Sequence, residues 1–232
     1  MINRSAARKM QVIHNIVTDT EIRPGLGGII VAGGRSSRMK GEMKSLLPFA
    51  GTPIIKRIAI EMSQLCQSIT VAAANEHQAE QYRRLELTVT MDDAPDQGPL
   101  VAFYSALQQV EEELIWLSAC DMPLATAQSA AWMLQQLTDS GANAVIPEIG
   151  GKLHPLQALY RKEGVQQLAS LIADGERRMG VMVRQLEPLI VTEQSFKAAG
   201  IDLNFVCNIN TPEEYEDMQY RFRISEEANE YG

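Results

Sequence analysis

Cysteine is scarce in this sequence, and its pattern argues against a disulfide scaffold. The three cysteines among 232 residues are Cys66, Cys120 and Cys207, and no two of them form a CxxC pair. An odd and widely spaced set is typical of reduced cytosolic proteins. We therefore expect a cytoplasmic protein whose thiols are free.

Long apolar runs and an excess of positive charge are also missing. No run approaches the ~18 apolar residues that a membrane span needs, and the basic residues near the N-terminus lead into no apolar segment of the secretory type. Lys and Arg number 21 against 29 Asp and Glu, which gives a formal net charge of −8. A general nucleic-acid binder would carry a basic stripe. We therefore expect neither a membrane nor a nucleic acid as a partner.

Two common glycine-rich motifs do not fit the stretch from Gly28 to Lys44. It reads GIIVAGGRSSRMKGEMK, which matches neither G-x-G-x-x-G nor G-x-x-x-x-G-K-[ST]. Gly33 and Gly34 let backbone N–H groups approach an anion closely. The loop adds basic and hydroxyl side chains, namely Arg35, Ser36, Ser37, Arg38, Lys40 and Lys44. A sharp turn would explain the glycines, but local positive charge in an acidic protein favours a phosphate-binding loop.

Strand and helix patterns alternate four times in the first 140 residues. The expected strands cover 28–33, 68–74, 87–91 and 113–119, and the expected helices cover 53–66, 75–85, a segment opening at 98, and 126–138. This pattern predicts an α/β fold, a three-layer Rossmann-like sheet that is mostly parallel with helices on both faces. Ligands of such sheets bind beyond the carboxyl ends of the strands.

The second half of the chain is less regular. Its expected strands cover 143–147, 154–160, 188–192 and 204–208, and its expected helices cover 163–173, 178–184 and a segment that starts at Thr211 with a capping-box spacing. We expect an N-terminal extension over 1–25, a single domain over 26–223 and a polar tail over 224–232.

Acidic residues follow two of the expected strands. Asp121 comes directly after a buried apolar strand, where a carboxylate suits Mg²⁺ shared with substrate phosphates, although a helix cap or turn would also use an aspartate. Asp92 could contact a ribose or base or join the metal site, or it could lie in a solvated turn. Gly98 opens a helix whose N-terminus can face the ligand crevice.

Other candidate residues have weaker patterns. Arg177 and Arg178 could hold a second anionic substrate, or they could form a solvated charged turn. His77 and His154 lack a metal-ligand spacing, so we expect them to be structural or exposed. Cys120 has no paired base, which indicates a small buried apolar residue rather than a nucleophile.

Several motifs occur together in order: VAGG-x-S-x-RM at 31–39, Lys44, GPL at 98–100, CDMP at 120–123, GERR at 175–178 and NINTPEE at 208–214. Together they resemble the molybdenum cofactor guanylyltransferase family over residues 28 to about 220. The resemblance implies a Rossmann-like nucleotidyltransferase fold, GTP and molybdopterin as substrates, Mg²⁺ as cofactor and pyrophosphate as the leaving group. Proteins that insert molybdenum or mature molybdoenzymes would be its partners.

The resemblance and the loop patterns together predict the following site. The nucleotide would contact Val31, Ala32, Gly33, Gly34, Lys44, Asp92, Gly98 and Asp121. Asp121 would be the metal ligand, and Arg38 and Lys44 would stabilise the departing pyrophosphate. The pterin would contact Arg177, Arg178, Asn208 and Asn210.

The sequence departs from the family pattern at Lys40, Met43 and Ala73. These departures leave two other hypotheses open. One is a nucleotidyltransferase that uses CTP or another phosphorylated acceptor, and the other is a nucleotide-binding module without catalysis.

Overall fold

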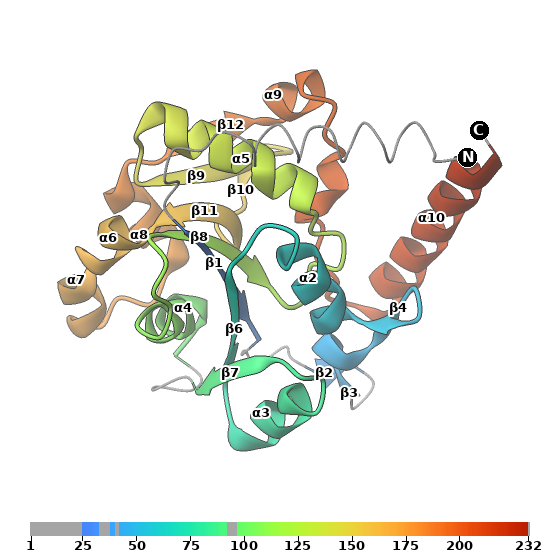
Figure 1. Cartoon of the computed structure of the whole chain (residues 1–232), viewed down its shortest axis with the longest axis horizontal. Helices are drawn as coiled ribbons and strands as arrows, with labels where there is room; N and C mark the ends of the chain where they lie inside the picture. Colours follow the sequence, from blue (N-terminus) through green and yellow to red (C-terminus); the bar gives the residue numbers. More distant parts are fainter. Residues whose placement is uncertain (1–24, 33–37, 40–41, 92–96, 232) are drawn as a thin grey trace.

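The computed structural model describes residues 25–32, 38–39, 42–91 and 97–231. In this part of the chain, eight strands form one sheet with the order β10-β9-β11-β8-β1-β6-β7, and β12 pairs with β9 (Figure 1). The strands are β1 (Leu26–Val31), β6 (Ser68–Ala73), β7 (Thr88–Met91), β8 (Leu114–Ala119), β9 (Ala144–Ile149), β10 (Lys152–Leu153), β11 (Gln157–Arg161) and β12 (Leu189–Thr192).

The sheet is parallel at its centre, as predicted. β8, β1, β6 and β7 are all parallel neighbours, and their sequence order requires crossover helices. β11 is antiparallel to both β8 and β9, because a short connection through β10 returns the chain beside them. Two small ribbons precede the first crossover, β2 (Arg38–Met39) with β3 (Glu42–Met43) and β4 (Pro48–Phe49) with β5 (Thr52–Pro53).

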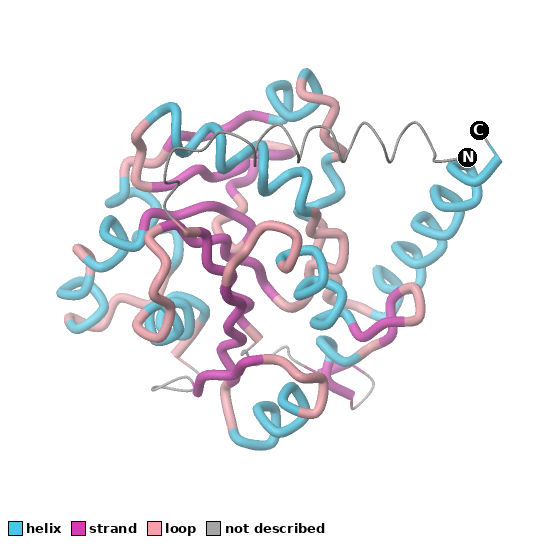
Figure 2. Tube along the Cα trace, viewed as in Figure 1, coloured by secondary structure: helices cyan, strands magenta, loops and turns pink. Residues whose placement is uncertain are grey.

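Helices cover both faces of the sheet, which gives the expected three layers (Figures 1 and 2). The helices are α2 (Ile54–Met62), α3 (Glu76–Arg83), α4 (Pro99–Leu107), α5 (Ala127–Ser140), α6 (Lys162–Gln166), α7 (Ala169–Ala173), α8 (Met179–Leu186), α9 (Glu193–Ala198) and α10 (Pro212–Tyr231), with 3₁₀ turns η1 (Lys44–Leu46) and η2 (Leu203–Val206). Helix α10 extends away from the body of the molecule (Figure 1).

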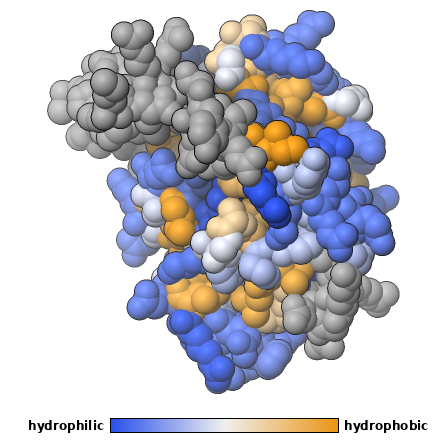
Figure 3. Space-filling view, turned by 90° about the vertical axis from the view of Figure 1, so that its right-hand side faces the viewer, coloured by the Kyte–Doolittle hydropathy of each residue, from blue (hydrophilic) through white to orange (hydrophobic). Residues whose placement is uncertain are grey.

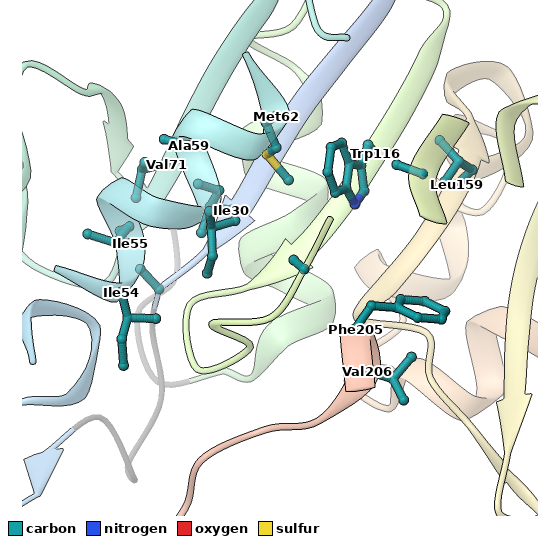
Figure 4. Close-up of a cluster of buried hydrophobic side chains, with 14 of the residues drawn as sticks. Ile30, Ile54, Ile55, Ala59, Met62, Val71, Trp116, Leu159, Phe205 and Val206 are labelled. Carbon is teal, nitrogen blue, oxygen red and sulfur yellow. The ribbon is translucent and has the colours of Figure 1, made fainter. Parts of the chain in front are cut away.

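Alternating residues of β1 divide the core into two clusters. Ile30 packs with α2, α5 and η2 on one face, whereas Ile29 and Val31 pack with α4 and α8 on the other. On the first face, Phe205 and Val206 of η2 lie on the same side of the sheet as Trp116 (Figure 4). This packing places the chain after η2 beside the carboxyl ends of β1 and β8.

Two expectations for the second half were wrong. Residues 204–208 are not a strand, because Asp202 accepts a hydrogen bond from the Asn204 amide at 2.9 Å and starts the turn η2. The helix expected over 163–173 is divided into α6 and α7. Helix α10 continues to Tyr231, through most of the segment from 224 that was expected to be a polar tail.

Helices α2 and α10 begin differently. Helix α2 has no side-chain cap, since Thr52 pairs in β5 and Pro53 precedes the first helical residue. The capping box at the start of α10 is confirmed, because the Glu214 amide donates to Thr211 Oγ1 and the Thr211 amide donates to Glu214 Oε2, both at 3.2 Å. No helix among the described residues is long and apolar enough to cross a membrane.

Candidate active site

Strands β1 and β8 end side by side and form the floor of the site. The Cys120 amide donates to the Val31 carbonyl at 3.0 Å, and the Ala32 amide donates to the Ala72 carbonyl at 3.0 Å. Val31 and Ala32 are buried, so they can meet a ligand through their backbone alone. Gly33, Gly34 and Asp92 lie outside the described residues, and Arg38 is described only by its backbone in β2.

Lys44 is a buried cation at this edge of the sheet. Lys44 is the first residue of η1 and is 4% exposed. Its Nζ donates to the Ile209 carbonyl at 3.3 Å. A buried ammonium requires acceptors because it has lost its water. The bond joins residues that are 165 positions apart, so the fold itself brings this charge to the site.

Asp121 also contacts Ile209, through the amide of Ile209 rather than its carbonyl. The Ile209 amide donates to the Asp121 carbonyl at 2.9 Å. Burial raises the pKa of the Asp121 carboxyl above its ordinary value, and the nearby Lys44 ammonium offsets part of that rise. Lys44, Asp121 and Ile209 therefore form one unit, which we call the Lys44–Asp121 cluster.

Asn208 and Asn210, which were predicted to contact the pterin, lie on either side of Ile209 in the chain. Both are exposed, whereas Ile209 between them is buried. Glu214 of α10 fixes the segment, because its Oε2 accepts a hydrogen bond from the Asn210 amide at 2.6 Å. The two asparagines are therefore the chain neighbours of the residue that contacts both Lys44 and Asp121.

Gly98 belongs to a second group of predicted residues. It precedes α4 with a φ of +95°, and a Cβ placed there would lie 3.6 Å from the Arg177 carbonyl oxygen. The Arg177 Nε donates to Gln97 Oε1 at 2.6 Å, and its Nη1 donates at 2.8 Å to the carbonyls of Ile172 and Glu176. We call residues 175–178 the Arg177 turn, and it is fixed against the start of α4.

Arg178 extends from this turn towards solvent. It pairs with Glu176, with 2.7 Å between Nη2 and Oε2 and 2.9 Å between Nε and Oε1. These bonds, together with the amides of Arg178 and Arg177, lower the pKa of Glu176 to about 2. A hollow of about 510 Å³ is lined by this turn together with Leu171 and Asp174. The turn is therefore both charged and internally paired.

The structure places His77, His154 and Cys120 as expected for structural or exposed residues. His77 is exposed, and His154 contacts the Ile149 carbonyl through Nε2 at 3.4 Å. Burial and the neighbouring Asp121 raise the pKa of the Cys120 thiol, with burial as the larger cause. A thiol that stays protonated at neutral pH is a poor nucleophile.

Ile209 and Gln97 contact predicted site residues, and Arg57 contacts the loop after Asp121, but none of the three was among the predicted residues. Ile209 entered the sequence analysis only as the apolar residue of the NINTPEE motif, and Gln97 and Arg57 are common surface residues that belong to none of the motifs. The alternation of Asn208, Ile209 and Asn210 was a usable signal, because a buried residue between two exposed polar ones orients both outwards.

The described residues contain no group of three or more His, Cys, Asp or Glu that could hold a metal ion by themselves. Asp121 is one partly buried carboxylate at the end of β8. Mg²⁺ is commonly held by one or two carboxylates together with substrate phosphates. The donor set therefore fits a metal that arrives with a nucleotide rather than a resident metal cage.

Residues 28–189 match the family of MobA-like NTP transferase domains. The chain belongs to this family. A probable molybdenum cofactor guanylyltransferase of Bacillus cereus (strain AH187) is 29% identical over 195 residues, covering 83% of this chain and 94% of the relative. One from Carboxydothermus hydrogenoformans is 27% identical over 197 residues, covering 85% and 96%. The protein is therefore a nucleotidyltransferase, and the predicted resemblance is confirmed.

Solved structures confirm the fold. Molybdopterin-guanine dinucleotide biosynthesis protein A of Archaeoglobus fulgidus superimposes with a TM-score of 0.72 at 21% identity, covering 85% of this chain and 98% of that one. CMP:2-keto-3-deoxy-manno-octonic acid synthetase complexed with CTP superimposes with a TM-score of 0.60 at 15% identity, covering 87% and 99%. At these identities the likeness concerns the fold alone.

Proposed function

We propose that this nucleotidyltransferase transfers GMP from GTP to the terminal phosphate of molybdenum-bearing molybdopterin and releases pyrophosphate. The supporting observation is the meeting of Lys44 and Asp121 at Ile209, at the carboxyl edge of β1 and β8. Ligands of open α/β sheets bind at this edge. The names of the relatives suggest which substrates to test.

The proposed step is an in-line displacement at phosphorus. An oxygen of the acceptor phosphate forms a bond to the α-phosphorus of GTP, and the bond from that phosphorus to the oxygen bridging to the β-phosphate breaks. The acceptor phosphate is already ionised at neutral pH, since its second pKa is about 6, so no side chain has to remove a proton. The protein's contribution is positioning and charge neutralisation.

Asp121 is the residue that would hold Mg²⁺. When bound, Mg²⁺ supplies positive charge to the nucleotide phosphates. The Asp121 carboxyl must be ionised for this role, yet burial raises its pKa. Lys44 favours the ionised form, which gives this buried cation a function before any phosphate arrives.

The remaining nucleotide contacts are proposed for residues at or after the carboxyl ends of the strands. Lys44 and Arg38 would stabilise the departing pyrophosphate. The backbone from Val31 to Gly34 would approach the phosphates, Gly98 would present the N-terminus of α4, and Asp92 would contact the guanosine.

The acceptor would lie between the two groups of residues. Asn208 and Asn210 supply amide donors and acceptors beside the Lys44–Asp121 cluster, and Arg177 and Arg178 supply positive charge. A pterin ring carries several hydrogen-bonding groups and the substrate carries a phosphate, so amides and guanidinium groups complement it. We place this reaction in the cytoplasm.

Pyrophosphate release tests the proposal directly. The protein is incubated with Mg²⁺ and molybdenum-bearing molybdopterin, and separately with GTP, CTP, ATP or UTP. We expect release with GTP alone among the four. Release with CTP and not GTP would replace the guanine assignment, and binding of GTP and the pterin without release would support a non-catalytic module.

A further inference from the structure

Arg57 of α2 contacts the loop that carries the predicted metal ligand Asp121. Its Nε donates to the Pro123 carbonyl at 2.9 Å. Pro123 is two residues after Asp121, in the loop that joins β8 to α5. Since proline has no N–H, its carbonyl is the one strong backbone group through which this residue can be held.

The loop from 120 to 127 is held at several points by other elements. The Cys120 amide donates to Val31, the Asp121 carbonyl accepts from Ile209, and the Ala127 amide donates to Glu61 Oε2 at 2.9 Å. Arg57 and Glu61 are four residues apart and therefore lie on one face of α2. One helix thus contacts the middle and the end of the loop.

Arg57 also contacts two aromatic rings. Its guanidinium carbon lies 4.6 Å from the ring centroid of Phe222 and 5.7 Å from that of Phe49. The two rings lie 5.3 Å apart at 59° to each other. A planar guanidinium can donate in its plane while its face rests on an aromatic ring, which an ammonium cannot do.

Phe222 connects this arrangement to the acceptor side of the site. It lies on α10, which begins two residues after Asn210. Helix α10 is also held by bonds from Tyr215 Oη and from Gln219 Nε2, the latter 2.7 Å long, to the Pro48 carbonyl. A groove of about 600 Å³ opens here, lined by Arg57 and Phe222 together with Asn208 and other residues. The surface on the side of α10 has separate apolar patches among hydrophilic residues (Figure 3).

We infer that Arg57 is a positioning residue, which holds the Asp121 loop in the geometry needed for a metal–nucleotide complex and links it to α10. This inference rests on the proposed function. Partners that orient a metal ligand typically change metal affinity by ~10–100-fold when removed. Arg57 touches neither substrate in the proposed arrangement. Its replacement should therefore change only the part of GTP binding that depends on Mg²⁺ at Asp121.

The test uses the affinity of the full chain for GTP, measured by equilibrium titration with and without Mg²⁺. In Arg57→Met, which keeps an unbranched apolar stem, we expect the gain in GTP affinity from Mg²⁺ to fall about tenfold. Affinity without Mg²⁺ should stay unchanged. Arg57→Lys, which can still donate to Pro123, should recover part of the gain. Arg84→Met, which removes an exposed pair with Glu80 on α3, is the matched control and should behave as the wild type.

Amide hydrogen exchange provides a readout without any ligand. In Arg57→Met, exchange in a peptide covering 120–127 should become faster, while exchange in β6 stays slow. Wild-type Mg²⁺ dependence or unchanged exchange in this variant would overturn the inference, as would an equal loss of GTP affinity without Mg²⁺. If the wild type itself shows no effect of Mg²⁺ on GTP binding, the proposed function fails, and the exchange measurement alone decides whether Arg57 holds the loop.

Discussion

The Lys44–Asp121 cluster and the Arg177 turn are built in opposite ways, although both lie at the carboxyl edge of the sheet. In the cluster, Lys44 and Ile209 are buried and Asp121 is half-buried, and the bonds join segments far apart in the sequence. The turn is partly exposed and pairs mainly within itself, with Arg178 77% exposed and bound to a carboxylate two residues away. Such a difference suits a rigid centre for phosphate chemistry and an adjustable surface for a second substrate.

Removing the carboxylate of Asp121 should have the largest effect. We expect Asp121→Ala to lose most pyrophosphate release, about 10²–10³-fold as for other single groups that stabilise a transition state. The fold should survive, because the bond from Ile209 uses the backbone carbonyl of Asp121 and not its side chain.

Asp121→Asn is the matched variant, since it keeps the shape and loses the charge. It should resemble Asp121→Ala in activity and the wild type in thermal unfolding. Full turnover by either variant would contradict the metal assignment.

Lys44→Met should lower the rate less and change the pH dependence. Burial raises the pKa of Asp121, and Lys44 and a backbone hydrogen bond lower it. Loss of the ammonium removes the larger of the two opposing effects, so the pKa rises further. The ionised carboxylate then forms only at higher pH, and the acidic limb of the pH–rate profile should move to higher pH.

Lys44→Arg keeps the charge and should leave that limb near its wild-type position. A Lys44→Met profile that is merely lower, with an unmoved acidic limb, would show that the two charges do not interact. The profile of pyrophosphate release between pH 5 and 9 is the measurement.

The difference between local patterns and contacts between distant segments explains what the sequence could predict. The parallel sheet followed from alternating apolar patterns, and Asp121 followed from its place after a buried strand. The bonds from Ile209 to Lys44 and Asp121 could not be predicted, because they depend on where η2 and α10 return to the sheet. Residues 204–208 were mistaken for a strand because short apolar runs fit several structures.

Gly98→Ala tests the contact between the Arg177 turn and the start of α4. A φ of +95° is strained for any side chain, and the nearest atom to an added Cβ is 3.6 Å away, so the cost comes from the backbone and not from a clash. We expect stability to fall by ~1–3 kcal/mol, measured by urea unfolding.

Gly180→Ala is the matched control within α8. Its added Cβ would meet the end of the Arg184 side chain at 3.9 Å, and no positive φ opposes it. This variant should be more stable by ~0.5–1 kcal/mol. Equal effects of the two substitutions would mean that Gly98 is not strained.

Glu176→Gln should have the smallest effect and should be confined to the exposed region. Arg178 and two amides lower the pKa of Glu176 from 4.5 to about 2, so this carboxylate stabilises the folded state above pH 4.5 and that contribution is lost as the pH falls towards 2. The variant should therefore lack this part of the acid dependence of unfolding. It should also raise the KM for the pterin by a few-fold, since Arg178 loses its partner, while the KM for GTP stays unchanged. A change in both KM values would show that the Arg177 turn and the Lys44–Asp121 cluster act as one site.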